Sequence, residues 1–132
     1  RKLEKAIAGQ MKNMFRIKYD DENMEVINLS GGNQQKIVFG KWAAGDADIF
    51  FLDEPTRGVD VGARKEIYNH IVEMANQGKA ILVISSDITE LLETAHRIMV
   101  MHQGKLTGEL LHEDATEEKI IAFATGIETG VN

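Results

Sequence analysis

The stretch Leu29-Ser30-Gly31-Gly32-Asn33-Gln34-Gln35 runs directly into Lys36-Ile37-Val38-Phe39, and it predicts a loop that becomes a helix. Ser30 is a suitable N-cap, because its hydroxyl can accept a hydrogen bond from a backbone N–H of the first helical turn. Gly31 and Gly32 carry no side chain, so a ligand can approach their backbone closely. This helix start, with its amides and positive dipole end, predicts a docking point for an anion, above all a phosphate. The alternative for an isolated Ser-Gly-Gly is a capped helix with no ligand.

A second stretch, Ile49-Phe50-Phe51-Leu52-Asp53-Glu54, follows shortly downstream. An apolar run of strand length that ends in two acids predicts a buried parallel strand delivering carboxylates to its C-terminal edge. Ligands of open α/β sheets bind at that edge. The alternative is that Asp53 and Glu54 are surface acids in a turn before Pro55, and the four apolar residues ahead of them disfavour it.

Together, the two stretches resemble the signature motif and the Walker B strand of ATP-binding-cassette (ABC) ATPases. The segment Arg57-Gly58-Val59-Asp60 falls where that family has its D-loop. The longer pattern in residues 29–36 and 53–64 resembles the second cassette of double-cassette ATPase subunits in bacterial monosaccharide importers of the ribose, galactose and xylose type. The resemblance extends from about Met11 to about Gly126 and implies a fold of the α/β class, a partial P-loop NTPase domain.

The resemblance also implies a division of the chain. Residues 1–45 would be part of the helical (signature) subdomain. Residues 46–126 would be the C-terminal part of the ATPase core subdomain, a largely parallel sheet with flanking helices and a terminal β-hairpin. We expect residues 127–132 to be a frayed tail.

Hydrophobic periodicity predicts the individual elements. Helices are expected over roughly 2–16, from Ser30 onwards, over 63–77, from Asp87 through Ala95, and over 116–124. Strands are expected over 49–53 and 80–84, parallel to each other, and a hairpin is expected over 98–111, with positive φ at Gly104. Several apolar side chains are predicted to be core: Leu3, Ile7, Met11, Met14 and Phe15 in the first helix; Val26 and Ile27 in the connection; Ile37, Val38, Trp42 and Ala43 in the signature helix; Ile67, Ile71, Val72 and Ala75 in the third.

Composition narrows the function classes. The chain has 132 residues and a formal net charge of −6, which disfavours a general nucleic-acid-binding role. It has no Cys, so a disulfide framework and a thiolate metal site are excluded for this sequence. Its four histidines show no ligand-like spacing, and no apolar run approaches the roughly 20 residues that span a bilayer. The N-terminus does not resemble a signal peptide.

The family resemblance assigns roles residue by residue. Asp53 would hold Mg²⁺ through a water, and Glu54 would be the catalytic base that polarises the attacking water. Asp60 would be the D-loop aspartate that communicates between two nucleotide sites. The signature residues would contact ATP held by the opposite cassette, in trans: Ser30, Gly31, Gly32 and Gln34. The implied cofactors are ATP and Mg²⁺.

Two departures from the family pattern limit these roles. Nothing in the sequence matches Gly-x-x-x-x-Gly-Lys-[Ser/Thr], so this chain has no phosphate-cradling loop of that kind. The family places that loop upstream, which predicts that the chain is a C-terminal fragment, inactive alone. The family's switch histidine is replaced by Ser86, which cannot take the role of an imidazole. We therefore expect an asymmetric machine in which the site of the second cassette is degenerate or regulatory.

The resemblance further implies partners and location. The partners would be the first cassette of the same polypeptide, transmembrane permease subunits and, indirectly, a periplasmic sugar-binding protein, at the cytoplasmic face of the bacterial inner membrane. The sugar is not specified by this sequence. Two alternatives stay open: a non-transport ABC ATPase of translation or DNA repair, and a non-catalytic interaction module.

Overall fold

The computed structural model describes residues 2–21, 23–45 and 47–126, and its contacts divide the chain into unit 1 (Arg1–Ile84) and unit 2 (Ser85–Asn132). Unit 1 contains, in chain order, α1 (Lys2–Met14), the 3₁₀ turn η1 (Val26–Asn28), α2 (Gly31–Ala43), β1 (Ile49–Asp53), α3 (Val61–Asn76) and β2 (Ala80–Ile84). Unit 2 contains α4 (Ile88–Thr94), β3 (Arg97–His102), β4 (Lys105–Leu111), the 3₁₀ turn η2 (His112–Asp114) and α5 (Glu117–Ala124). The predicted subdomain division near residue 45 stays a prediction, and the predicted tail lies outside the described residues.

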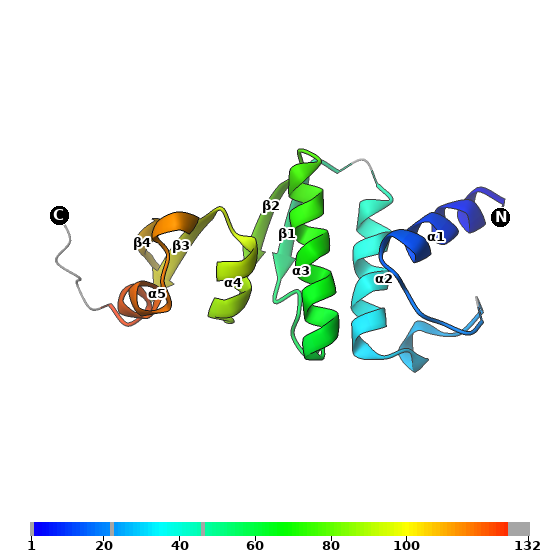
Figure 1. Ribbon diagram of the computed structural model, residues 1–132, viewed down its shortest axis with the longest axis horizontal. Coiled ribbons are helices and arrows are strands. Elements are labelled where there is room, and N and C mark those ends of the chain that lie inside the picture. The colour runs from blue at the N-terminus through cyan, green and yellow to red at the C-terminus, as the bar shows by residue number, and fades with distance from the viewer. Residues whose placement is uncertain (1, 22, 46, 127–132) are drawn as a thin grey trace. The chain divides into compact units, whose positions relative to one another are not determined.

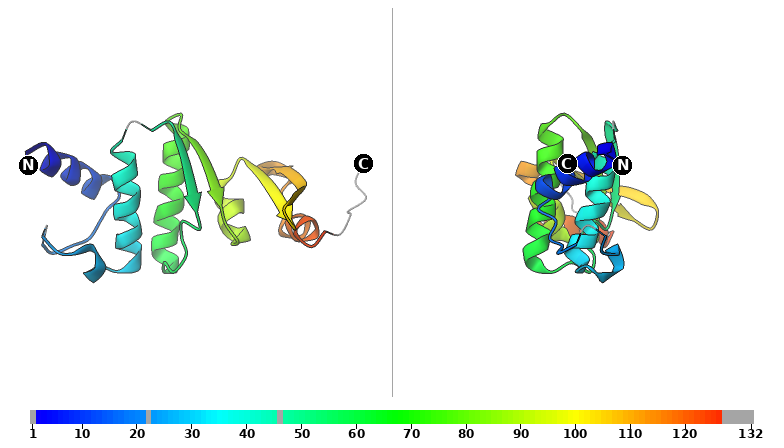
Figure 2. Two further views of the ribbon diagram at one scale, coloured as in Figure 1. Left: turned by 180° about the vertical axis from the view of Figure 1, so that it is seen from behind. Right: turned by 90° about the vertical axis from the view of Figure 1, so that its right-hand side faces the viewer.

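Unit 1 is layered. Strands β1 and β2 pair in parallel, with Ile49 opposite Ala80 and Asp53 opposite Ile84, as predicted. Helix α3 lies between this two-stranded sheet and α2, and α1 packs on the other side of α2 (Figures 1 and 2). One apolar cluster joins the layers, and its buried members are Phe15, Ile17, Phe39, Val59, Ile67 and Ile71.

The helix starts follow from side-chain caps. The Ser30 hydroxyl accepts from the backbone N–H of Asn33 at 3.4 Å, which confirms the predicted cap of α2. The Asp60 carboxylate accepts from Ala63 N–H at 3.0 Å and starts α3 at Val61, two residues earlier than predicted. Gly78, with φ of +89°, follows the end of α3, where a left-handed residue was predicted.

Two of the side chains predicted to be buried in α2 are exposed, Val38 at 46% and Trp42 at 59%. Ile37 is half-buried and packs against the apolar cluster, and the predicted burial of Ala43 lies outside the side chains that the structure describes. The inward positions are instead Gly32, Lys36, Phe39 and Gly40. These inward positions keep helical spacing. Two of them are glycines because α2 lies close to its neighbours, and one is a lysine, which is paired with Glu66 of α3. For Gly40, an ideal Cβ would be 3.2 Å from the Cβ of Met11.

Three other burial predictions need correction. The strands are buried on one face only, since Ile49 is 63% and Phe51 is 74% exposed, and no described element covers them. Val26 and Ile27 are exposed because η1 is a surface turn. In the first helix, Leu3 and Met14 are exposed, while Phe15 is buried, because only the C-terminal end of α1 reaches the apolar cluster.

Unit 2 is a hairpin covered by helices. Strands β3 and β4 are antiparallel, and the turn between them has positive φ at Gln103 and at Gly104, as predicted for the glycine. Ile98 and Val100 of β3 are buried with Ile120 of α5, and α4 packs against the same cluster. The Asp87 carboxylate accepts from Thr89 and Glu90 N–H groups, which confirms the predicted start of α4.

Candidate functional site

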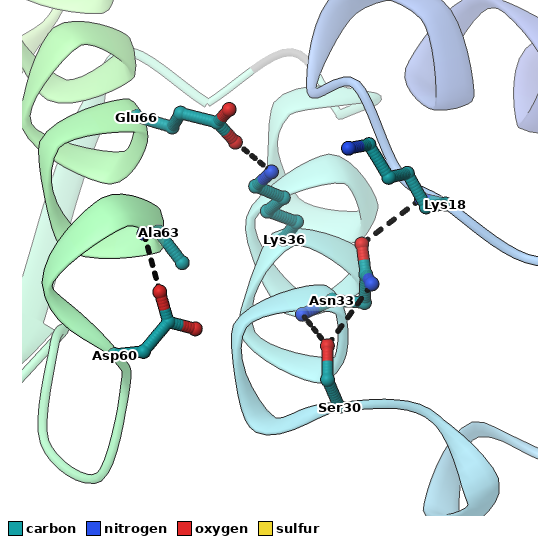
Figure 3. Close-up of polar contacts among 7 residues, drawn as sticks. All are labelled: Lys18, Ser30, Asn33, Lys36, Asp60, Ala63 and Glu66. Atoms are coloured by element: carbon teal, nitrogen blue, oxygen red, sulfur yellow. Dashed lines mark hydrogen bonds and ion pairs between the residues drawn. The ribbon is translucent and has the colours of Figure 1, made fainter.

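Two helix N-termini lie side by side at one end of unit 1. Helices α2 and α3 run in the same direction, and their capping residues Ser30 and Asp60 lie at the same end (Figures 1 and 3). Each helix places roughly half a positive charge at its N-terminus. At α3 the capping carboxylate of Asp60 offsets this charge, whereas α2 is capped by the neutral hydroxyl of Ser30. The start of α2 is therefore the end that suits an anion, and the anion site predicted from residues 29–35 stays a prediction.

The two signature glycines differ in their surroundings. Gly31 is exposed, and an ideal Cβ on it would lie 3.3 Å from the carbonyl oxygen of Gly58. Gly32 is buried, and an ideal Cβ on it would lie 2.7 Å from the Cβ of Ala63. The exposed backbone at this helix start therefore belongs to Gly31, whereas Gly32 faces the first turn of α3.

The carboxyl end of β1 carries the two acids. Asp53 is exposed and ends the strand, opposite Ile84 of β2. Glu54 is half-buried with φ of +48°, and its N–H donates to the Ile84 carbonyl at 2.8 Å. A non-glycine residue in this left-handed region is strained by about 1–2 kcal/mol. This strain was not foreseen from the sequence.

An ion pair joins the two helices one turn above their starts. The Lys36 ammonium of α2 donates to Glu66 of α3 (Figure 3), and the Lys36 side chain is 6% exposed while that of Glu66 is 38% exposed. The hydrogen bond from Lys36 lowers the pKa of the Glu66 carboxyl, and this effect exceeds the rise in pKa that the partial burial of Glu66 causes. Sequence reasoning missed this pair, because Lys36 occupies a position where an apolar residue is expected.

The amide side chains of the signature brace its own loop. Asn33 donates from Nδ2 to the Ser30 hydroxyl at 3.0 Å and accepts at Oδ1 from the Lys18 N–H at 2.9 Å (Figure 3). Gln34 donates from Nε2 to the Leu29 carbonyl at 2.8 Å. Gln34 thus holds the loop in this structure, and its predicted contact with a nucleotide stays a prediction.

His70 lies on α3 beyond Glu66. Its ring packs against Phe15, with centroids 4.5 Å apart, and its side chain is 11% exposed. Burial lowers the pKa of the His70 imidazole; Lys36 acts in the same sense, and Glu73 and Glu66 act against it. The neutral imidazole is therefore the form that the fold prefers.

Ser86 belongs to unit 2, in the loop ahead of α4. Its neighbour Ser85 accepts at Oγ from the Asp87 N–H at 3.0 Å.

Across residues 2–21, 23–45 and 47–126, no three His, Asp, Glu or Cys side chains gather closely enough to hold a metal ion. A single exposed carboxylate such as Asp53 cannot hold Mg²⁺ alone. It can take part in a site in which waters and nucleotide phosphates supply the other ligands, as is usual for Mg²⁺. None of the helices in the described ranges could cross a membrane.

The chain matches no protein-family model. It is 55% identical over 117 residues to a putative ribose/galactose/methyl galactoside import ATP-binding protein of Halalkalibacterium halodurans, covering 89% of this chain and 22% of that protein. It is 50% identical to an arabinose import ATP-binding protein of Pectobacterium atrosepticum, covering 89% and 23% of the two chains. A ribose import ATP-binding protein of Oceanobacillus iheyensis is 48% identical, covering 95% and 25%. The chain spans about a quarter of the length of these relatives.

Solved structures agree on the fold. An ATP-binding cassette of an ABC transporter aligns with a TM-score of 0.75 at 21% identity, covering 89% of this chain and 48% of that one. A cassette solved as a dimer in a post-hydrolysis state with ADP and Pi aligns with a TM-score of 0.70 at 23% identity, covering 81% and 46%. The described fold is therefore part of an ABC ATPase cassette, as predicted.

Proposed function

We propose that this chain, which matches the C-terminal part of ABC-type sugar-import ATP-binding proteins, completes a nucleotide site whose phosphate loop belongs to another cassette. It would act as part of an ATP-hydrolysing subunit that energises sugar import. In that role the chain supplies the signature motif in trans, together with a Walker B strand and a D-loop.

The observation that supports this proposal best is the pair of parallel helix starts. Gly31 is exposed at the start of α2, and Asp60 caps α3 beside it. Apolar side chains are exposed next to both starts, with Ile27 at 78% and Val61 at 83% exposure. An anion-attracting end flanked by exposed apolar residues suits a surface that closes on another protein with a phosphate between them.

The site residues of this chain would each have a separate role in binding or hydrolysing ATP. Ser30 would offer its hydroxyl, and Gly31 and Gly32 their backbone N–H groups, to the terminal phosphate of ATP held by the opposite cassette. Gln34 would contact the same nucleotide. Asp53 would hold Mg²⁺ through a water, and the ion would supply charge neutralisation at the phosphates. Glu54 would polarise a water as the general base, and its strained backbone suits a residue held for function.

The site that this chain contributes through Glu54 would be the weaker of two, because Ser86 stands where the family has a histidine. A hydroxyl cannot act as the protonatable group that an imidazole provides. The nucleotide site completed by Ser30 and Gly31 would be the working one. The two halves of the machine would then be asymmetric.

The proposal extends to partners and place. The first cassette of the same polypeptide would be the direct partner. Transmembrane permease subunits would bind the two cassettes and change conformation as the cassettes close and open around ATP. A periplasmic sugar-binding protein would take part indirectly. The location would be the cytoplasmic face of the bacterial inner membrane.

The test uses the full-length protein and its ATPase rate. Glu54→Gln is expected to reduce turnover far less than the matching change in the first cassette, and Ser30→Tyr is expected to abolish most of the turnover. Equal losses from the two glutamate changes would refute the asymmetry. An unchanged rate in Ser30→Tyr would refute the role in trans.

A further inference from the structure

The buried position of Gly32 gives it a second reason to be glycine. The usual advantage of a bare backbone is access for a ligand, but the Cα of Gly32 faces α3. An ideal Cβ there would lie 2.7 Å from the Cβ of Ala63, closer than real Cβ atoms approach, and 3.6 Å from Cγ1 of Val59. The third atom within reach is Oδ2 of Asp60 at 3.7 Å, an ordinary contact distance. The close contact is with the Cβ of Ala63, which is bonded directly to the backbone of α3 and cannot move aside as the end of a flexible side chain could.

The same interface continues one turn further along both helices. Lys36 lies four residues after Gly32, so the two residues share one face of α2, and Glu66 lies three residues after Ala63, so these two share one face of α3. The two faces are directed at each other. Lys36 is 5% exposed and is paired with Glu66 across the interface. A buried ammonium that lost this carboxylate would be costly, so the ion pair fixes how far one helix can slide along the other.

We propose that Gly32 and Lys36 are positioning residues, which hold the start of α2 against the start of α3 so that Gly31 and Asp60 are presented as one rigid surface. This inference rests on the proposed function for its consequence in catalysis. The contact itself does not depend on that function. In this view the Cα of Gly32 acts through its contact with Ala63.

A side chain at Gly32 could impair turnover for either of two reasons. If it obstructs a nucleotide, removing the methyl group of Ala63 will not help. If it pushes α2 away from α3, the change Ala63→Gly makes the missing room. The exchange of the two residues, Gly32→Ala with Ala63→Gly, therefore separates the explanations while keeping the amino-acid composition constant.

The experiment measures thermal unfolding and ATP turnover per folded molecule in the full-length protein. Gly32→Ala is expected to lower the melting temperature and to reduce kcat at least 10-fold, and the exchange variant is expected to recover kcat to within about 3-fold of wild type. Gly9→Ala is the matched control, since Gly9 lies in α1 with nothing within 4 Å of an added Cβ. Gly9→Ala should raise the melting temperature and leave kcat unchanged. If Gly32→Ala does not fold, Ala63→Val crowds the same contact from α3 and should reproduce the loss.

Three results would overturn the inference. An exchange variant that stays as impaired as Gly32→Ala would show that the added methyl meets the nucleotide. A melting temperature that rises in Gly32→Ala, as in Gly9→Ala, would show that the helices have room. A melting temperature that falls and recovers with no change in kcat would leave a structural contact without a positioning role. Failure of the proposed function looks different, because Ser30→Tyr would then leave turnover unchanged while the rescue in melting temperature persisted.

Discussion

At the scale of single residues, Glu54 combines a predicted catalytic role with a strained backbone. The residue follows β1 directly, has φ of +48° and donates its N–H to the Ile84 carbonyl. Strain of this kind persists where the surrounding structure imposes it, and it is common at functional sites. Nothing in the order Asp53-Glu54-Pro55 signals a left-handed conformation, so only the structure could reveal it.

The strain predicts an inverted preference between glycine and alanine at this position. Both Glu54→Ala and Glu54→Gly delete the side chain, but only glycine tolerates the positive φ without cost. Glu54→Gly should therefore be about 1 kcal/mol more stable than Glu54→Ala in chemical denaturation. At Asp53, within β1, the order should reverse. Glu54→Ala at least as stable as Glu54→Gly would contradict the strain.

A second residue-scale prediction concerns pH. The pKa of His70 is lowered in the folded state, so the unfolded chain takes up a proton first as the pH falls from its ordinary value of 6.5. Stability should be complete above that pH and should decline as the pH falls toward the folded-state pKa. Denaturation curves between pH 7.5 and 5.5 should show this decline, and His70→Gln should remove most of it.

The contribution of Glu66 to stability lies in a separate pH window. Its pKa is lowered from 4.5, so its stabilisation is present above that value and is lost only at lower pH. The two groups can therefore be told apart in one titration. A decline between pH 7.5 and 5.5 that is unchanged in His70→Gln would exclude His70 as its source.

At the scale of elements, α2 shows where pattern reading succeeds and where it fails. Its start at Gly31 and its Ser30 cap follow from local chemistry, and both were predicted. Its buried face was not, because Lys36 is buried by Glu66, 30 residues away in sequence, while Trp42 is exposed. Hydrophobicity could not indicate this, since the nearness of α3 decides which side chains fit.

The parallel pair β1–β2 and the hairpin β3–β4 were predicted correctly, because turn residues and apolar runs are local signals. Tyr68 and Met74 of α3 are buried although they were not predicted, whereas Val72 and Ala75 are half-buried. The period of α3 was right, but the centre of its buried stripe is displaced. That displacement depends on where the sheet and α2 contact the helix.

The Lys36–Glu66 pair predicts unequal effects of its two halves. Glu66→Gln leaves a charged lysine in a buried place, so it should cost about 2 kcal/mol of unfolding free energy. Lys36→Met leaves a carboxylate that is 38% exposed and can be solvated, so it should cost roughly 0–1 kcal/mol. Chemical denaturation of the two variants measures the difference. Equal costs would mean that Lys36 reaches water in solution.

At the scale of the molecule, one face of the β1–β2 sheet is left exposed by the residues that the structure describes. Ile49 and Phe51 of β1, with Leu82 and Ile84 of β2, are between 38% and 74% exposed on this face. The opposite face carries Phe50, which is 7% exposed. Contiguous exposed apolar surface of this kind marks a contact with another part of a protein. Since solved cassettes are about twice the length that the chain covers, we propose that further cassette structure covers it.

Alanine substitutions in the full-length protein test this cover. Phe50→Ala should cost about 3 kcal/mol, as is usual for a buried phenylalanine. If further cassette structure covers the exposed face of the sheet, Phe51→Ala should lower the unfolding free energy by a similar amount, although Phe51 is 74% exposed in this chain. A cost below about 0.5 kcal/mol for Phe51→Ala would mean that the face remains open to solvent.

The proposed function requires the start of α2 to meet the terminal phosphate of ATP held by the other cassette. The 132 residues have no cysteine, so Ser30→Cys places a unique thiol at this start once any cysteine elsewhere in the full-length protein has been replaced by serine. An ATP analogue with a thiol-reactive group on its γ-phosphate would then label that thiol. We expect labelling that is lost when the phosphate-loop lysine of the first cassette is replaced, and that survives the same change in the second cassette. Labelling that depends instead on the second cassette would contradict the proposed function.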